Sequence, residues 1–201
     1  MTLWAAEPGR ARASPTLVIG ARIEEAVAGS AAEVAAAMGE EGELVQARFA
    51  RGCRCLAVRA GGEVAAYGWL STGPEWIGEL GLEIRPGPAE AYVWNCVTLQ
   101  PHRRRGLFRA LLHTAVDRAG RERLARLWIG TVDDVGVSAV AHAGFQPLLS
   151  IGVLDLPCAG WLSVSGAPGA QPETVEAALQ VLGGRRGRLR SGPRSRVRRR
   201  H

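Results

Sequence analysis

The sequence has no lysine, no paired-cysteine motif and no long apolar run, and these absences narrow the class of protein. A transmembrane helix needs about 20 consecutive apolar residues, and no stretch of the chain approaches that length. The first fifteen residues lack the long apolar segment of a secretion signal. We therefore expect a cytoplasmic protein with no membrane partner.

The four cysteines, Cys53, Cys55, Cys96 and Cys158, form no CxxC pair. Without a secretion signal a disulfide framework is not expected. Small buried thiols are the simplest interpretation, and no metal site is predicted. A catalytic cysteine at Cys96 would need a neighbouring base, and none can be identified in the sequence.

Charge is divided unevenly along the chain. All 19 acidic residues precede residue 183, and nine of the 25 arginines lie at or after Arg185. Residues 1–182 therefore carry 16 arginines against 19 acids, a net charge of −3, while the tail carries +9. The tail has too little apolar content to fold alone. We interpret it as an unselected extension, an arm for nucleic acid or an acidic partner, or a weaker contact with anionic membrane.

Hydrophobic residues make up 47% of the chain, which is enough for a substantial core. Their spacing changes between the period of strands and that of helices. Strands are predicted at Thr16–Ile23, Cys55–Arg59, Glu63–Ser71, Glu79–Arg85, Ala91–Leu99, Leu127–Val132 and Phe145–Leu156. Helices are predicted from Ser30 to Gly39, at Leu44–Arg51, from Leu107 to Ala119, at Val135–Ala143 and at Pro172–Leu182.

Local signals support this order of elements. Ser30 and Glu33 have the spacing of a capping box, and Gly61-Gly62 is typical of a hairpin turn. The mostly apolar Ala91–Leu99 should be a central strand. The strand–helix–strand step after it implies a right-handed crossover with parallel pairing. We expect an α/β fold of the α+β kind, a mixed, mostly antiparallel sheet with helices on both faces.

The composition also suggests domain boundaries. We expect a flexible leader at residues 1–15, one folded domain at residues 16–165, and a C-terminal extension at residues 166–201. The extension would hold a short helix followed by the disordered arginine-rich tail.

The stretch His102–Leu112 joins the expected central strand to an amphipathic helix. Gly106 at this junction lets the backbone turn sharply and leaves amide N–H groups uncovered. The first amides of a helix have no internal partner, and the helix dipole adds partial positive charge. With Arg103, Arg104 and Arg105 beside it, this junction is suited to a polyanion such as a pyrophosphate.

The same stretch resembles the acyl-CoA loop of the GNAT N-acetyltransferases, whose pattern is (Gln/Arg)-x-x-Gly-x-(Gly/Ala). Arg103 fills the first position and Gly106 the glycine, whereas Phe108 stands where the family has a small residue. The Gly144-Phe145 pair and the Arg48-Phe49 segment before the second strand also match the family.

The resemblance covers about residues 20–156 and implies a GNAT-like fold. In that fold the fourth and fifth strands splay apart, and the pantetheine arm of acetyl-CoA, or another acyl-CoA, enters like an added strand. No metal is implied. The coenzyme would be held by Cys96, Val97 and Thr98, by Arg103, Arg104, Arg105, Gly106, Leu107 and Phe108, and by Asp133, which precedes the Gly-Phe pair.

The family mechanism is direct attack of a neutral amine on the thioester, which needs a proton acceptor. The position of the family's fourth-strand glutamate holds Tyr92, and Glu90 lies two residues earlier on the same face. Glu79 and Glu83 on the preceding strand are alternatives. For each, a plain surface or pairing role is the competing interpretation. Many relatives have a tyrosine that acts as the general acid, and its position holds Val140 here. The thiolate would therefore leave unprotonated or take a proton from water.

Other candidates are weaker. His102 lies at the phosphate end of the loop, and His113 and His142 fall on helices where we expect them to be solvated. The tryptophans of the expected meander either line an acceptor pocket or pack in the core; they are Trp69, Trp76 and Trp94.

The sequence therefore predicts an N-acetyltransferase that moves an acetyl or longer acyl group from its CoA ester to a primary amine of a small molecule. One alternative is a GNAT-shaped module that binds acyl-CoA without turnover. Another is a nucleic-acid-binding protein that uses both Arg103–Arg105 and the tail. Outside this alternative, nucleic acid is expected to bind only through the tail. A homodimer is compatible with the sequence, although no motif encodes it.

Overall fold

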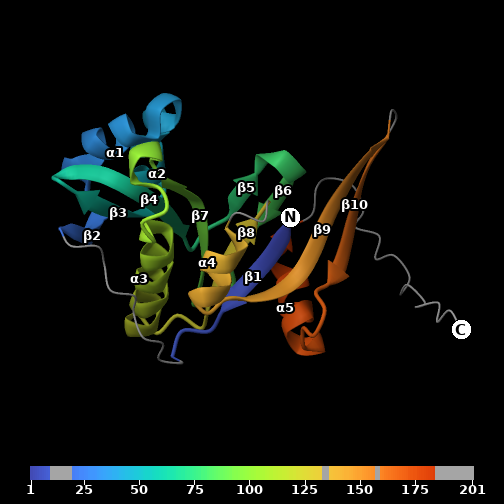
Figure 1. Cartoon of the computed structure of the whole chain (residues 1–201). Coiled ribbons are helices and arrows are strands. Elements are labelled where there is room, and N and C mark those ends of the chain that lie inside the picture. Colours follow the sequence, from blue (N-terminus) through green and yellow to red (C-terminus); the bar gives the residue numbers. More distant parts are fainter. Residues whose placement is uncertain (10–19, 133–135, 157–158, 184–201) are drawn as a thin grey trace, which may run out of the picture.

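The computed structural model describes residues 1–9, 20–132, 136–156 and 159–183, which form a large sheet and a small one (Figure 1). The large sheet contains β1 (Thr2–Ala6), β2 (Ala21–Ala26), β3 (Arg54–Ala60), β4 (Glu63–Ser71), β7 (Glu90–Thr98), β8 (Arg126–Thr131), β9 (Gln146–Leu156) and β10 (Ala159–Gly166). The small sheet contains β5 (Glu75–Ile77), β6 (Leu82–Ile84) and β11 (Leu182–Gly183). The α-helices are α1 (Ala31–Met38), α2 (Val45–Ala50), α3 (Leu107–Arg121), α4 (Val137–His142) and α5 (Pro172–Val181).

Short 3₁₀ segments connect several of these elements. They are η1 (Ala28–Ser30), η2 (Gly39–Leu44), η3 (Gly78–Leu80) and η4 (Gln100–His102). Of these, η2 joins α1 to α2, and η4 leads from β7 toward α3. Both matter for the site described below.

The strands of the large sheet run in the order β10-β9-β1-β8-β7-β4-β3-β2. Neighbouring strands are antiparallel except β7 and β8, which are parallel. Because parallel neighbours need a crossover connection, α3 links their ends across one face of the sheet. The sheet is therefore mixed and mostly antiparallel, as the sequence predicts.

Helices cover both faces of the large sheet, which confirms the expected layers. Helices α3 and α4 share one hydrophobic cluster with β3, β4, β7 and β8, and α3 stands in front of the sheet in Figure 1. On the opposite face, α1 and α2 pack on β3 and β4. Beyond β7 that same face is covered by α5 and the small sheet. The fold thus has three layers around the pair β7 and β8.

Many of the elements predicted from the sequence are confirmed within a few residues. The Gly61-Gly62 turn joins β3 to β4, the central strand is β7, and the amphipathic helix after it is α3. The α3 stripe of Leu107, Leu111, Leu112 and Ala115 is buried because those positions repeat on one helical face. The first expected strand begins on residues outside the described part of the chain, and the observed β2 starts at Ala21.

The expected flexible leader at residues 1–15 is wrong for its first residues. Thr2–Ala6 is β1, which lies inside the sheet between β8 and β9, and four of its five residues are buried. The terminal amine of Met1 donates to Ile151 O at 2.7 Å, and Trp4 Nε1 donates to Thr131 Oγ1 at 2.9 Å. This five-residue strand has no alternating polar face, so its sequence gave no strand signal.

The region between β4 and β7 also differs from expectation. Glu79–Arg85 does not form a third strand of the meander: Gly78–Leu80 is 3₁₀, and Leu82–Ile84 pairs with β5 and β11 in the small sheet. Gly81 interrupts the expected strand, because its φ of 57° is a left-handed conformation that a strand does not contain. Strand β10, which pairs along β9, carried no prediction.

The expected capping box of the first helix is absent. Ser30 Oγ does not bond a helical amide of α1; it pairs with the backbone of Val27 at 3.0 and 3.1 Å. Glu33 forms an ion pair with Arg59 instead. A cross-strand arginine therefore replaces the local contact that the spacing indicated.

The expected boundary at residue 165 does not separate two units. Helix α5, predicted at Pro172–Leu182, is confirmed, but Ala178, Val181 and Leu182 are part of the same core cluster as Leu3 and Trp128. The arginine-rich tail lies outside the described residues. In the part of the chain that the structure describes, no helix is long and apolar enough to cross a membrane.

We predict that β1 is essential for stability. Leu3 is 0% exposed, so Leu3→Ala should lower the free energy of unfolding by about 2–5 kcal/mol, the usual cost of a buried leucine truncation. The same substitution at Leu179, which is 45% exposed on α5, is the matched control and should change stability little. Urea denaturation followed by tryptophan fluorescence measures both, and equal midpoints for the two variants would contradict the placement of β1.

Candidate active site where strands β7 and β8 part

Strands β7 and β8 pair over their first residues and then separate. Their register runs from Glu90 opposite Arg126 to Val93 opposite Ile129. Farther along, the pairing recorded for β7 in the described chain is with β4. The edge of residues 94–98 that faces away from β4 is therefore open. Such an edge presents N–H and C=O groups to which an extended ligand can add as a further strand.

A β-bulge lies at the point where the strands part. Two residues of β7, Asn95 and Cys96, stand opposite the single residue Gly68 of β4, and Asn95 has a φ of 42°. A bulge re-aims local backbone groups and bends the strand. Glycine is required opposite it, because a Cβ at Gly68 would lie 2.7 Å from Cys96 Sγ and 2.9 Å from Leu111 Cδ2.

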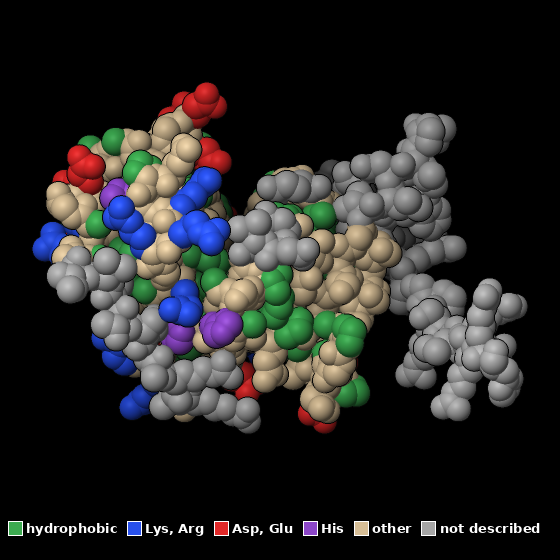
Figure 2. All heavy atoms as spheres, in the orientation of Figure 1, with side chains coloured by type: hydrophobic (Ala, Val, Ile, Leu, Met, Phe, Trp, Pro, Cys, Tyr) green, Lys and Arg blue, Asp and Glu red, His purple; other side chains and the backbone are tan. Residues whose placement is uncertain are grey.

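The start of α3 has the backbone geometry that the sequence predicts for an anion site. Gly106 is the N-cap with a φ of 73°, and no side chain caps the helix. The first helical bond runs from Ala110 N to Gly106 O at 3.0 Å, so the amides of Leu107, Phe108 and Arg109 have no acceptor within the helix. Arginine side chains gather over α3 and the loop before it (Figure 2), so positive charge surrounds these amides.

The three loop arginines are exposed and stand between β7 and α3. Arg103 Nε donates to Thr98 O at 3.3 Å, which ties the loop to the end of β7. Arg104 has a φ of 63°, a backbone conformation that non-glycine residues rarely adopt. The structure thus brings together the predicted coenzyme residues of β7 and of the loop, Cys96 to Phe108.

Phe108 does not obstruct the helix start. Its side chain is half-buried and packs against the core cluster under α3. Its Cε1 atom lies 3.6 Å from the position that a Cβ on Gly136, the N-cap of α4, would take. The ring therefore points toward the N-terminus of α4 and packs against the core.

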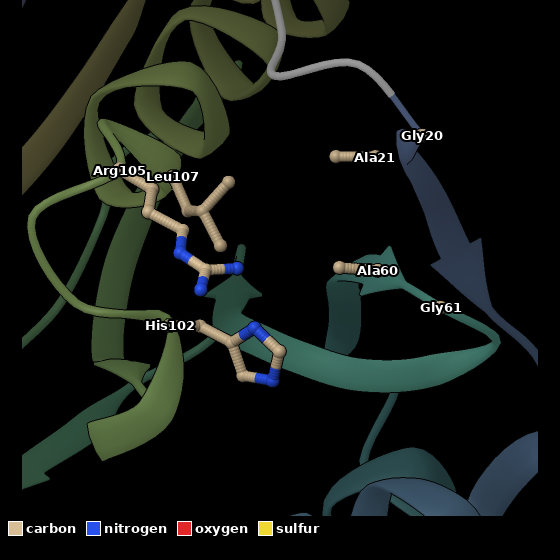
Figure 3. Close-up of a pocket in the computed structure, with 7 residues that line it drawn as sticks. All are labelled: Gly20, Ala21, Ala60, Gly61, His102, Arg105 and Leu107. Atoms are coloured by element: carbon tan, nitrogen blue, oxygen red, sulfur yellow. The ribbon is translucent and has the colours of Figure 1, made fainter.

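His102 faces a different part of the molecule. With Arg105 it lines a pocket of about 290 Å³ whose other walls are Gly20, Ala21, Ala60, Gly61 and Leu107 (Figure 3). Strand β4 separates the strands of these walls from β7. His102 Nδ1 is buried without a hydrogen-bond partner. Its position away from the open edge of β7 argues against the role of amine base.

Glu90 is engaged in structural bonds at the paired start of β7. Its carboxylate accepts from Gly87 N at 2.9 Å, from Arg126 Nη1 at 3.1 Å and from Trp128 Nε1 at 2.8 Å. Both oxygens are therefore occupied, at the end of the strand opposite to the bulge. The geometry supports the pairing interpretation of Glu90.

The other predicted catalytic residues have equally specific surroundings. Tyr92 is 6% exposed in the cluster that includes Trp128, and its hydroxyl lies 3.3 Å from the position of a Cβ on Gly130. Glu83, on the small sheet, accepts from Arg85 Nε at 2.8 Å. Glu79 belongs to η3, and its side chain lies outside the described part.

The three cysteines of the described chain are free thiols. Burial raises the pKa of the Cys96 thiol to about 12, with Cys55 adding to the effect. The thiol is therefore protonated at neutral pH and is not a nucleophile. Burial likewise raises the pKa of Cys55 to about 12. These values fit the interpretation of small buried thiols.

The tryptophans divide between core and surface. Trp69 is 0% exposed and packs on Phe49 with ring centroids 5.2 Å apart, whereas Trp76 is 62% exposed. Trp94 is half-buried beside Arg48. Asp133, the remaining predicted coenzyme residue, falls outside the described residues.

A polar cluster that the sequence analysis does not predict lies beside the β7 bulge. Glu41 of η2 accepts from Arg48 Nη2 at 2.8 Å and from Asn95 Nδ2 at 2.6 Å. Asn95 is 54 positions from Glu41 in the chain, and the three residues match no motif, so only the fold brings Asn95 to the Glu41–Arg48 pair.

The sequence model of the Acetyltransferase (GNAT) family matches residues 12–145, which is more than half of the chain. The chain belongs to the GNAT family. Acyl transfer from an acyl-CoA such as acetyl-CoA is the activity of that family. Within the described ranges no group of three or more His, Cys, Asp or Glu residues is placed to hold a metal.

Solved structures of GNAT proteins share the fold. One is a GCN5-related N-acetyltransferase from Kribbella flavida (TM-score 0.51, 18% identity, 86% of this chain and 60% of that one). A second is a GCN5-related N-acetyltransferase from Sphaerobacter thermophilus (TM-score 0.54, 13% identity, 73% of this chain and 47% of that one). A third is the ribosomal-protein-alanine N-acetyltransferase from Brucella melitensis biovar Abortus 2308 (TM-score 0.50, 18% identity, 68% of this chain and 99% of that one). At these identities the likeness establishes the fold, and this chain spans less than two thirds of the first two. No curated protein sequence matches the chain.

We predict that Glu90 stabilises the fold without contributing to coenzyme binding. Glu90→Gln should lower the free energy of unfolding by about 1–3 kcal/mol, because the amide leaves donors of Arg126 and Trp128 imperfectly paired. Acetyl-CoA affinity should stay unchanged. Glu176→Gln on the exposed face of α5 is the matched control. Urea denaturation and calorimetric titration measure the two quantities; unchanged stability with weakened binding would contradict the structural role.

Proposed function

We propose that the protein is an N-acetyltransferase that moves an acetyl group from acetyl-CoA to a primary amine of a small molecule, in the cytoplasm. One observation carries the proposal: β7 separates from β8 directly before an uncapped, arginine-flanked helix start. An open strand edge that is followed along the chain by an anion site suits a coenzyme that has an extended amide arm attached to a pyrophosphate.

Each part of the coenzyme has residues suited to it. The amides of Leu107–Arg109 and the guanidinium groups of Arg103, Arg104 and Arg105 would bind the pyrophosphate. The open edge of β7 from Cys96 to Thr98 would bond the pantetheine amides. Backbone N–H groups at the bulge would stabilise the oxyanion that forms when an amine attacks the thioester carbonyl.

The choice of an amine acceptor is supported by negative charge on the face of the sheet that is covered by α1 and α2, which we call the acceptor face. The η2 segment, between α1 and α2, carries Glu40, Glu41 and Glu43. Acidic side chains stand at the top of the lobe that holds α1 and α2 (Figure 2). Protonated amines are attracted to such a rim, whereas the arginine-rich loop attracts the coenzyme.

A second candidate function is a module that binds acyl-CoA without turnover. Val140, which stands at the position of the family's acidic tyrosine, is 0% exposed in the core. Glu90 is fully bonded, as described above. Release of CoA with any amine would exclude this second candidate.

We predict that acetyl-CoA raises the melting temperature and that the loop arginines are responsible. At 100 times its dissociation constant, a ligand that binds the folded state adds about 2.7 kcal/mol of stability. Replacing Arg103, Arg104 and Arg105 together by alanine should weaken binding by roughly 10- to 100-fold, because charge-assisted bonds to phosphate are worth about 1.5–3 kcal/mol.

Arg121→Ala is the control, since Arg121 is an exposed arginine at the other end of α3. Differential scanning fluorimetry with a coenzyme titration measures the shift. The absence of any shift at millimolar acetyl-CoA would contradict the proposed function.

A further inference from the structure

The carboxylate of Glu41 lies on the acceptor face of the sheet, next to the β7 bulge. It is the member of the η2 acids that has fixed partners. Its Oε2 accepts from Asn95 Nδ2 at 2.6 Å and from Arg48 Nη2 at 2.8 Å, while the side chain remains 56% exposed. Glu41 is therefore held in one place and is still open to a substrate.

Arg48 gives the carboxylate a rigid support. Its guanidinium stacks on the rings of Trp94 and Trp69, 4.6 and 5.2 Å from their centroids, and Arg48 is 6% exposed. Arg48 Nη1 also lies 3.9 Å from Met38 Sδ. A cation packed in this way has little freedom to turn, so the oxygen that it binds is fixed with respect to the sheet.

Asn95 connects the carboxylate to the strand that is expected to hold the thioester. It lies in the bulge, two residues after the last pair between β7 and β8. The amide that donates to Glu41 is thus attached to the backbone at the parting of the strands. An amine that approaches the thioester from the α1–α2 face would meet Glu41 there.

The other glutamates near the sheet centre do not offer a comparable group. Glu90 is fully bonded at the far end of β7, and Glu83 pairs with Arg85 on the small sheet. Glu75 is 6% exposed, and it binds Arg51 at 3.2 Å and Cys53 Sγ at 3.3 Å. Unlike these three glutamates, Glu41 has a carboxylate that is exposed, held by two hydrogen bonds and next to the bulge.

We propose that Glu41 is the catalytic residue that accepts the proton of the acceptor ammonium, with Arg48 and Asn95 as its positioning residues. This assignment rests on the proposed acetyl transfer. The ammonium passes one proton to the Glu41 carboxylate, and the neutral nitrogen attacks the thioester carbon. The C–N bond forms, the C–S bond breaks and its electron pair stays on sulfur. The thiolate takes the surplus proton of the nitrogen, which gives the amide and free CoA thiol, and Glu41 returns its proton to water.

The test compares Glu41→Gln with Glu63→Gln and Glu176→Gln, which make the same change on exposed side chains of β4 and α5, outside η2. CoA release from acetyl-CoA is measured against a panel of primary amines that includes spermidine, tyramine and free amino acids. Glu41→Gln should lose about 100-fold or more in kcat/KM, as expected for the removal of a general base, while both controls keep the wild-type rate. The deficit should narrow toward pH 10, because amines with a pKa of about 10.4 then supply their own neutral form.

Two further measurements separate chemistry from structure. Added formate should restore part of the rate in Glu41→Ala, which has room for a small carboxylate, and should do nothing for Glu63→Ala. Asn95→Gly, which retains the positive φ of the bulge, should lower kcat by about 10-fold without weakening acetyl-CoA binding. A merely structural Glu41 would show no rescue and no narrowing with pH.

The outcomes also distinguish this assignment from the function on which it rests. Equal rates in the wild type, Glu41→Gln and the two controls would overturn the role of Glu41 and leave acetyl transfer standing. A wild type that binds acetyl-CoA but releases no CoA with any amine would overturn both the transfer and the role of Glu41.

Discussion

The bulge in β7 is the constraint on which the site depends. One extra residue in this strand ends its pairing with β8, and the partner strand accommodates the bulge only because Gly68 has no side chain. Since β7 and β8 are parallel, a helical crossover must start at the end of β7. The start of α3, with its free amides, is therefore placed beside the open strand edge. The adjacency of the two features is thus a consequence of topology, and no additional contact is needed to create it.

Where β7 separates from β8, β8 loses a pairing partner along one edge, and β1 pairs with its other edge. Strand β8 keeps its pairing with β7 over residues 126–129, whereas β1 pairs along the other edge from Leu127 to Thr131. At the end of β8 where β7 is absent, Thr2 stands opposite Thr131, and Trp4 donates to the hydroxyl of that threonine. The N-terminal strand therefore holds the free arm of the fork in place. This explains why a segment that lacks any strand signal is buried in the middle of the sheet.

Local information in the sequence was sufficient to predict the loop and helix α3 after β7, and it was insufficient to predict β1 and the cluster around Glu41. The glycine at a strand–helix junction, the arginines beside it and the apolar stripe of α3 are all features of one continuous stretch, and each acts where it stands. By contrast, β1 is a strand because of what lies on both sides of it. The contact between Glu41 and Asn95 joins residues 54 positions apart. The strand predicted at Glu79–Arg85 was wrong for a related reason, since β6 pairs with residues near the end of the described chain.

The position of Arg48 argues that the acceptor face is built for more than stability. Taking an arginine out of water costs several kcal/mol unless its partners compensate, and an apolar side chain of similar size usually serves a core as well. Here the cation is buried to 6% exposure between two tryptophans, yet its carboxylate partner is 56% exposed. An arrangement selected for stability alone would bury or omit both charges. A desolvated cation that fixes an exposed carboxylate at the parting of two strands is instead the arrangement expected where a charged substrate group must be received.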